Sequence, residues 1–381
     1  MNKYIYVDNS STTKINDMVL RKMMPYLQDY YGNASTIYEL GKISRNAMDV
    51  SRNIIAKCIN VEPEEIYFTG SGTEADNMAI QGIAHKYKEK GKHIITSKFE
   101  HLAVLNTCKK LEEEGFEVSY VDVGESGVID VEKIKEAIRE DTILISIMYV
   151  NNEIGTIQPV NEIAKIAREH NIIFHTDAVQ AIPHIDIDAS IFDLMSISSH
   201  KFNGPKGVGV LYVKKGIELS NIICGGHQER EVRPGTENVA GIVGMAEALR
   251  ITKDELKVRN EKEKKLQEYF LKKLNTEIEG VILNGDLNQR IYSNVNISID
   301  GVESSELMVF LDMSGICASS GSACNSESKE LSHVLKSIGQ KNSSIRFTLS
   351  SENTFYELDR IVYILKNSID ILKCKKKCKW L

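Results

Sequence analysis

Lys201 is the residue whose type and surroundings first suggest covalent chemistry. It follows an apolar run over residues 193–197 and precedes a loop rich in small residues over 203–207. A lysine amine that is partly removed from water can form a Schiff base with a carbonyl compound. From this segment alone, a surface lysine in a loop remains the alternative.

Two further segments could hold an anionic, electron-accepting group. Asp177 comes after the apolar run 172–174, where open α/β sheets place their ligands. In an enzyme that uses pyridoxal, such a carboxylate keeps the pyridine nitrogen protonated. The turn Gly70-Ser71-Gly72-Thr73 leads into a helical pattern, and free N–H groups at a helix start suit a phosphate. The alternatives are a helix N-cap at Asp177 and a simple cap at the turn.

Cys324 lies in a stretch of serine, glycine and alanine over residues 318–326. Because this stretch offers little for a thiol to pack against, we expect Cys324 to be exposed and reactive. Cys58, Cys108, Cys224 and Cys317 lie in more apolar stretches and are expected to be inert core residues.

No Cys or His spacing indicates a zinc site, so no metal site is predicted. His333 shows no ligand-like pairing, and we expect it to be structural or on the surface.

Short apolar runs alternate with helical patterns over the first two-thirds of the chain. Helices are expected over 73–90, 101–114 and 131–139. The alternation predicts an α/β fold whose mostly parallel sheet is covered by helices on both faces. Seven strands are expected, over 66–69, 93–96, 118–121, 143–150, 172–176, 194–197 and 208–213.

A long helical pattern over 241–275 joins this part to mixed strand and helix signals, which predict a smaller α+β domain. The expected large domain spans residues 15–255. The expected small domain comprises 1–14 and 256–381 and includes the segment that bears Cys324, about 314–330.

Composition and charge limit the possible partners. The chain has 381 residues, and 47 basic against 53 acidic side chains give a net charge of −6, which argues against nucleic-acid binding. No apolar run approaches the roughly 20 residues that span a bilayer, and the N-terminus lacks a secretory signal. Seven scattered cysteines fit reduced thiols, so a cytoplasmic protein is expected.

Several motifs occur together and in one order along the chain. In them the sequence resembles the cysteine desulfurases of the NifS/IscS type, within the class V, fold-type I pyridoxal-phosphate enzymes. The resemblance runs from residues 7–13 to 344–349. Its most specific stretches are 73–77, 150–156, 175–180, 198–201, 233–238 and 320–324.

The resemblance implies a role for each site residue. Lys201 would carry pyridoxal phosphate, and His101 would stack on its ring and move protons at the substrate thiol. Cys324 would accept the sulfur. The other cofactor-binding residues would be Asp177 at the pyridine nitrogen, Gln180 at the phenolic oxygen, and Gly72, Thr73, Ser198 and His200 at the phosphate, with Thr236 contributed by a second subunit. Asn152 and Arg346 would bind the substrate carboxylate.

The implied reaction converts L-cysteine to L-alanine and leaves a persulfide on Cys324. A homodimer would pass this sulfur to an acceptor or scaffold protein, for iron–sulfur clusters or for thiolated cofactors and tRNA. The only metal contact envisaged is a transient one between a cluster and the Cys324 persulfide. The alternatives are a selenocysteine lyase, another class V enzyme such as an aminotransferase, and a non-enzymatic scaffold.

The chain departs from the family pattern at a few positions. Tyr38 stands where histidine is usual, and Ser11 where alanine is usual. The basic end of the chain, from Lys373 onward, matches nothing in the pattern; it is either a solvated helix end or a docking tail.

Overall fold

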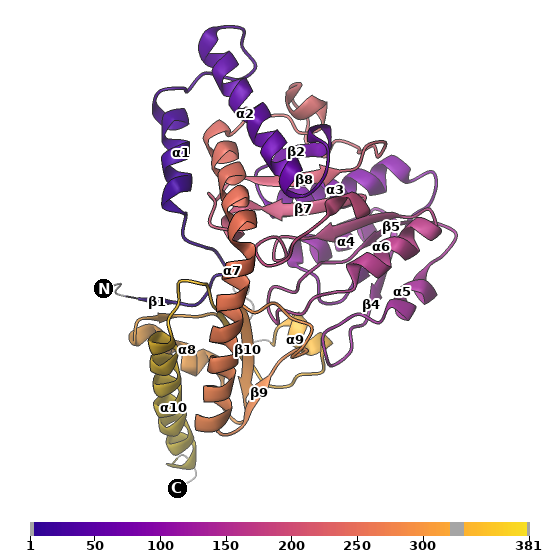
Figure 1. The fold of residues 1–381 in the computed structure, drawn as a ribbon. Coiled ribbons are helices and arrows are strands. Elements are labelled where there is room, and N and C mark those ends of the chain that lie inside the picture. Colours follow the sequence, from indigo (N-terminus) through magenta and orange to yellow (C-terminus); the bar gives the residue numbers. More distant parts are fainter. Residues whose placement is uncertain (1–3, 321–330, 379–381) are drawn as a thin grey trace.

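The computed structural model describes residues 4–320 and 331–378 and contains a larger, seven-stranded sheet and a smaller, three-stranded sheet, besides one two-stranded pair (Figure 1). Within these residues the larger sheet has seven strands, in the order β2-β8-β7-β6-β5-β3-β4. They are β2 (Ile66–Thr69), β3 (His93–Ser97), β4 (Glu117–Val121), β5 (Thr142–Ser146), β6 (Ile173–Asp177), β7 (Leu194–Ser198) and β8 (Gly209–Val213).

The larger sheet is parallel except at β8, which runs antiparallel to both β2 and β7. This confirms the predicted, mostly parallel sheet. The strand predicted over 143–150 is shorter than expected, because β5 ends at Ser146. Ile147 and Tyr149 still donate backbone hydrogen bonds to the carbonyl groups of His175 and Asp177.

Helices cover both faces of this sheet because neighbouring strand residues are apolar on both sides. In β3, Ile94 belongs to one core cluster and Ile95 to another, as successive side chains of a strand point to opposite faces. Helices α3 (Gly72–Tyr87) and α4 (Leu102–Glu113) pack on the Ile94 face. Helices α2 (Glu39–Cys58), α5 (Val131–Ala137), α6 (Val160–Glu169) and the start of α7 (Val239–Glu277) pack on the Ile95 face, and α1 (Asp17–Gln28) lies against α7.

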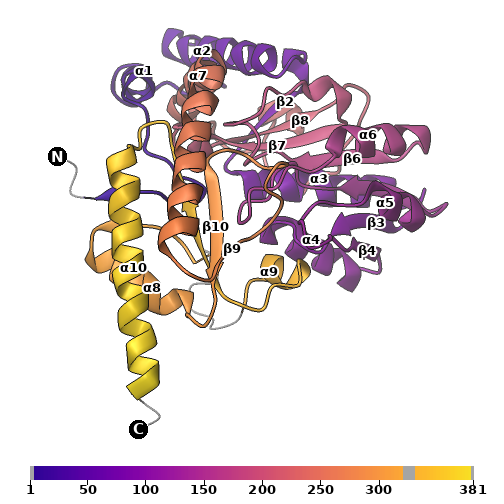
Figure 2. The same ribbon diagram turned by 60° about the horizontal axis from the view of Figure 1, so that its bottom comes forward.

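The smaller sheet is antiparallel, in the order β12-β10-β9. These strands are β9 (Val281–Leu283), β10 (Asn294–Ile299) and β12 (Ser344–Thr348). Helices α8 (Ser304–Met313) and α10 (Phe355–Cys378) pack with them, and a two-stranded parallel pair joins β1 (Ile5–Tyr6) to β11 (Ile316–Cys317). The short helix α9 (His333–Ser337) returns to the larger body, as Figure 2 shows.

Helix α7 runs from one core into the other without interruption (Figures 1 and 2). Its first half buries Met245 and Leu249 in the large core, and its second half buries Leu266, Phe270 and Leu274 in the small core. The ring of Phe270 meets that of Phe347 edge-on at 5.3 Å between centroids. The expected division of the chain at 255/256 falls within this helix and stays a prediction.

Neither a membrane span nor a metal cluster occurs among the residues that the structure places. None of their helices is long and apolar enough to cross a bilayer. The same residues contain no group of three His, Cys, Asp or Glu side chains that could hold a metal ion. Cys224 is exposed, so the expectation that it lies in the core is wrong, whereas Cys108 is buried as expected.

We expect Phe270→Ala to lower the free energy of unfolding by about 3–5 kcal/mol, because it leaves a cavity beside Phe347 in a core that excludes water. Denaturant titration measures this loss. Val258→Ala on the same helix is the control: Val258 is 70% exposed and should change the free energy by less than about 0.5 kcal/mol. Equal effects of the two substitutions would contradict the assignment of Phe270 to the small core.

Candidate functional site

A cavity of about 340 Å³ lies where several parallel strands of the large sheet end. Open α/β sheets bind ligands at this edge, and the volume suits a small molecule. The cavity brings together ten residues that the sequence analysis selected: Gly72, Thr73, His101, Asn152, Asp177, Gln180, Ser198, His200, Lys201 and Arg346.

Lys201 follows the end of β7 in a short turn, and its side chain reaches the N-terminal segment. Its Nζ donates hydrogen bonds to the backbone carbonyl of Ser10 and, at 3.0 Å, to that of Ser11. Gln180 Nε2 donates to the same Ser10 carbonyl at 2.9 Å. The N-terminal segment thus forms one wall of the cavity and contacts the amine directly.

Asp177 is the last residue of β6 and is almost fully buried. Its Oδ1 accepts a hydrogen bond from the backbone N–H of Val179 at 2.9 Å. Burial raises the pKa of Asp177, and the nearby His101 and Lys201 oppose that rise. A buried carboxyl group in this position favours a cationic partner within the cavity.

His101 caps the N-terminus of α4, and this contact fixes which ring nitrogen carries the hydrogen. Its Nδ1 accepts the backbone N–H of Ala103 at 3.1 Å, so the hydrogen of the neutral ring is on Nε2. Burial lowers the pKa of His101, which keeps the imidazole neutral. Beneath it, the buried carboxyl of Glu100 accepts hydrogen bonds from the Ser97 hydroxyl and the Met148 N–H.

The start of α3 forms a cradle that suits an anion. Ser71 caps this helix by accepting the Glu74 N–H at 3.1 Å, and Gly72 and Thr73 of its first turn line the cavity. A Cβ at Gly72 would stand only 2.8 Å from Val179 Cγ2, so glycine is needed for the backbone to lie this close to Val179. The positive end of the helix dipole favours a negative group at this position.

Ser198 and His200 complete this side of the cavity. His200 Nδ1 lies 3.1 Å from the Thr12 hydroxyl, and burial lowers the pKa of His200 to about 4. The ring is therefore neutral at pH 7 and offers hydrogen bonds rather than charge.

Arg346 lies opposite the cradle, on β12 of the small sheet, and is only 2% exposed. Its Nη1 donates to the Asn152 carbonyl at 2.9 Å. Its Nη2 donates to Asp8 Oδ1 at 2.9 Å and to Ser11 Oγ at 2.8 Å. A guanidinium in a cavity wall is suited to a carboxylate ligand, because its planar N–H groups match two oxygens.

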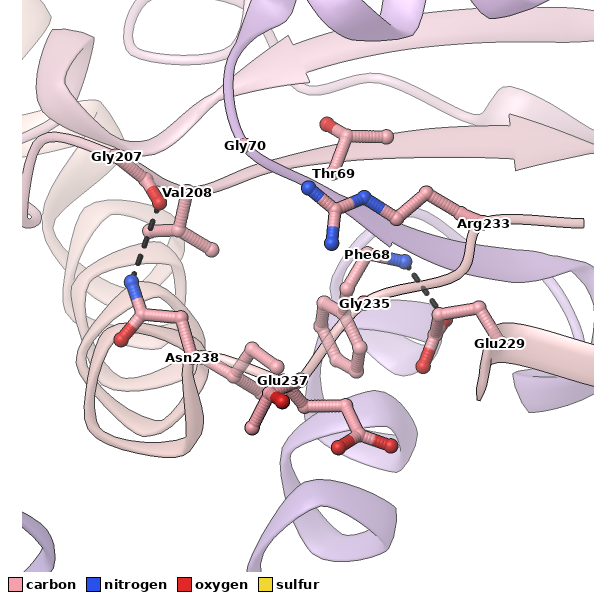
Figure 3. Close-up of a pocket in the computed structure, with 12 residues that line it drawn as sticks. Phe68, Thr69, Gly70, Gly207, Val208, Glu229, Arg233, Gly235, Glu237 and Asn238 are labelled. Atoms are coloured by element: carbon pink, nitrogen blue, oxygen red, sulfur yellow. Dashed lines mark hydrogen bonds between the residues drawn. The ribbon is translucent and has the colours of Figure 1, made fainter. Parts of the chain in front are cut away.

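One predicted site residue that the structure describes does not lie in this cavity. Thr236 lines a separate hollow of about 90 Å³, shown in Figure 3, together with Gly70, Arg233 and Glu237. Arg233 connects this hollow to the cradle, because its Nε donates to Glu74 Oε1 at 2.6 Å. Cys324 lies outside the residues that the structure describes.

The cavity wall also contains residues that the sequence analysis did not select. They include Asp76, Glu153, Ser332 and His333. The expectation for His333 was incomplete: its Nε2 bonds to the Glu100 carbonyl at 2.9 Å, but the ring also lines the cavity. Asp76 and Glu153 lie within the specific stretches 73–77 and 150–156, but no role followed from that, and Glu153 meets Ser332 only through the tertiary fold.

Comparisons with known proteins agree with this geometry. The aminotransferase class-V family matches residues 5–361. The "Cysteine desulfurase IscS" of Clostridium botulinum is 46% identical over 97% of this chain and 95% of its own length. That of Methanosarcina thermophila is 46% identical over 98% of this chain and 93% of its own length.

Solved structures show the same fold. One described as "NIFS-LIKE PROTEIN" is 34% identical, with a TM-score of 0.91 over 97% of this chain and all of its own. One described as "SspA in complex with cysteine" is 36% identical, with a TM-score of 0.82 over 92% of this chain and all of its own.

The buried carboxyl of Glu100 generates a pH-dependent prediction. Burial raises its pKa to about 8, so the folded chain keeps a proton that the unfolded chain loses near pH 4.5. The unfolding free energy should therefore fall as the pH rises from 5 to about 8. We expect Glu100→Gln to flatten this fall, measured by denaturant titration at several pH values. Glu113→Gln, on the exposed side of α4, is the matched control; identical slopes in both variants would contradict the prediction.

Proposed function

This chain belongs to the class-V aminotransferase family, and we propose that it is a cysteine desulfurase of the IscS type. The observation that carries the proposal is the single cavity that holds the amine of Lys201, the buried carboxyl of Asp177 and the guanidinium of Arg346. An amine for a carbonyl cofactor, an acid for a ring nitrogen and a cation for a substrate carboxylate are the groups this reaction needs.

The residues of the cavity fit pyridoxal 5'-phosphate. The glycine-dependent cradle at Gly72 and Thr73 suits its phosphate, with Ser198 and His200 beside it. The buried Asp177 suits its pyridine nitrogen. When bound, this cofactor withdraws electrons from the α-carbon of an amino acid. Further contacts come from Lys201, which would hold the cofactor, and from Gln180, whose amide would reach the phenolic oxygen.

Arg346 and Asn152 would bind the carboxylate of L-cysteine. The guanidinium is buried, and its position is fixed by the Asn152 carbonyl and Asp8, so little ordering remains to be done when substrate binds. His101 would stack on the cofactor ring and move a proton at the substrate sulfur through Nε2, because Nδ1 is held by Ala103. The amine of Lys201 would act as the base at the α-carbon.

Cys324 would accept the sulfur. It follows Ser319 by five residues, and the Ser319 backbone pairs with that of Arg346. Five residues span at most about 17 Å, so Cys324 would be able to reach the cavity from Ser319. In the net reaction the carbon–sulfur bond of L-cysteine breaks, and a sulfur–sulfur bond forms on Cys324. In this balance, the hydrogen of the Cys324 thiol becomes the third hydrogen of the L-alanine methyl group.

The enzyme would act as a homodimer in which Thr236 reaches the cofactor phosphate of the second subunit. Helix α1 exposes Met18, Leu20, Met24 and Leu27, an apolar surface of the kind that a second copy covers. The persulfide sulfur would pass to an acceptor or scaffold protein, for iron–sulfur clusters or thiolated cofactors and tRNA. A cytoplasmic location suits this chemistry, because Cys324 must remain a reduced thiol.

We expect Cys324→Ser to abolish persulfide formation while the protein keeps the visible absorbance of its bound cofactor. The serine hydroxyl cannot form a stable bond to the substrate sulfur. Mass spectrometry after incubation with labelled L-cysteine measures one added sulfur atom on Cys324. Cys224→Ser, which removes an exposed thiol, should behave like the unmodified protein. Undiminished alanine production by Cys324→Ser would refute the proposed function.

We expect Arg346→Ala to raise KM for L-cysteine about 10- to 100-fold, because the substrate carboxylate loses its charged partner. Steady-state kinetics of alanine formation measure the change. The KM of Arg346→Lys should lie between those of the unmodified protein and of Arg346→Ala, because lysine keeps the charge but lacks the planar set of N–H donors. Arg360→Ala removes an arginine that contacts only the Ser314 carbonyl in the described chain and should leave KM unaltered. A KM that Arg346→Ala does not change would place the carboxylate site elsewhere.

A further inference from the structure

Glu153 is a buried carboxyl group that the proposed reaction does not use. It is 2% exposed and lies in the wall of the same cavity. Its Oε2 accepts a hydrogen bond from the Ser332 hydroxyl at 2.6 Å. The Ser332 oxygen in turn accepts the Val334 N–H at 3.1 Å and so caps α9. One short hydrogen bond thus attaches the start of α9 to the cavity wall.

The turn that carries Glu153 is held rigidly. Its N–H donates to Asn151 Oδ1 at 2.9 Å. Its carbonyl accepts the side-chain amides of Asn294 and Asn296, each at 3.0 Å. The Arg346 guanidinium donates to the carbonyl of the preceding residue. The Glu153 carboxyl therefore has a fixed position relative to the proposed substrate-carboxylate site.

The chain is attached to this same site at a second point, on the other side of Cys324 in the sequence. The backbone of Ser319 pairs with that of Arg346, with N···O distances of 2.7 and 3.2 Å. Ser319 precedes Cys324 by five residues, and Ser332 follows it by eight. One attachment point is thus bonded to Arg346 itself, and the other to Glu153, whose neighbour Asn152 binds the guanidinium.

A carboxyl group is a costly choice for such a contact. Burial raises the pKa of Glu153, and the Ser332 hydrogen bond, His333 and Arg346 oppose that rise. Either protonation state retains an oxygen that accepts the Ser332 hydroxyl. The amide oxygen of glutamine does the same, whereas alanine leaves the hydroxyl without its acceptor.

We propose that Glu153 is a positioning residue for sulfur transfer. Through Ser332 it fixes, relative to Arg346, the point at which the chain re-enters the described fold after Cys324. The inference rests on the proposed function, in which Arg346 sets the substrate carboxylate and Cys324 accepts the sulfur. Transfer needs the two sulfur atoms within about 3–3.5 Å, and loss of this attachment lengthens the tether that brings Cys324 to the substrate, which slows the reaction without weakening substrate binding.

The test uses the cofactor-loaded, full-length protein and separates two rates. Glu153→Ala and Ser332→Ala should each lower kcat for alanine formation about 10-fold, as expected for the loss of one strong hydrogen bond, with KM within about twofold. The initial change in cofactor absorbance on mixing with L-cysteine precedes the transfer and should keep its rate. Glu153→Ala is the cleaner variant, because it leaves the Ser332 cap on α9 intact.

Conservative variants distinguish positioning from general damage. Glu153→Gln and Ser332→Thr retain the acceptor and the hydroxyl, and should recover most of the kcat. The double variant Glu153→Ala/Ser332→Ala should be no slower than Ser332→Ala alone, because that variant already removes the contact with Glu153. Ser337→Ala is the matched control: it lies on α9, and its hydroxyl contacts His333 and Lys98 carbonyls instead of Glu153.

The proposal is overturned if kcat is unchanged in Glu153→Ala, if KM rises in parallel, or if glutamine fails to restore the rate. Should Glu153→Ala not fold, the comparison of Ser332→Ala with Ser332→Thr decides the question in the same way. Failure of the proposed function itself has a different signature, since the unmodified protein would then form no persulfide from L-cysteine, or Cys324→Ser would still produce alanine. Loss of persulfide in Cys324→Ser together with normal rates in the Glu153 variants would overturn only the positioning role.

Discussion

The buried guanidinium of Arg346 is the contact on which the architecture of the site depends. It comes from the small sheet, yet its hydrogen bonds end on the N-terminal segment at Asp8 and Ser11 and on the large body at Asn152. A charge that is removed from water requires its partners to stay in place. Three segments that are far apart in sequence are thereby held at one point, and the cavity lies between them.

The same exclusion of water sets the charge state of the remaining groups. Burial favours the neutral forms of His101 and His200 and of the carboxyl groups of Asp76 and Glu100. A group in this cavity keeps its charge only where a partner of opposite sign stands beside it. A ligand that carries an anionic phosphate, a protonated ring nitrogen and a carboxylate would therefore find little competing charge.

The sequence was sufficient for much of the fold and the cavity, because their signals are local. Apolar pairs such as Ile94–Ile95 indicate a strand that is covered on both faces, and the residues that end such strands converge on one edge of the sheet. The antiparallel direction of β8 could not be predicted, because an apolar run looks the same whichever way the strand runs in the sheet. Glu153 and Ser332 are 179 residues apart, and no spacing rule connects them. Thr236 lies in another hollow of the same chain, so the role proposed for it would need a second copy, which one sequence does not describe.

Helix α7 has a consequence for how the two bodies can move. It spans 39 residues, and its glycines, Gly241 and Gly244, lie within its first turns, while proline is absent. Bends in helices arise at proline, glycine or local insertions, so the stretch between the two cores has no pivot. The helix acts as a stiff rod, so a displacement of the small sheet is transmitted along it to the large core. The two cores are therefore expected to move together as one body rather than to swing about a hinge in α7.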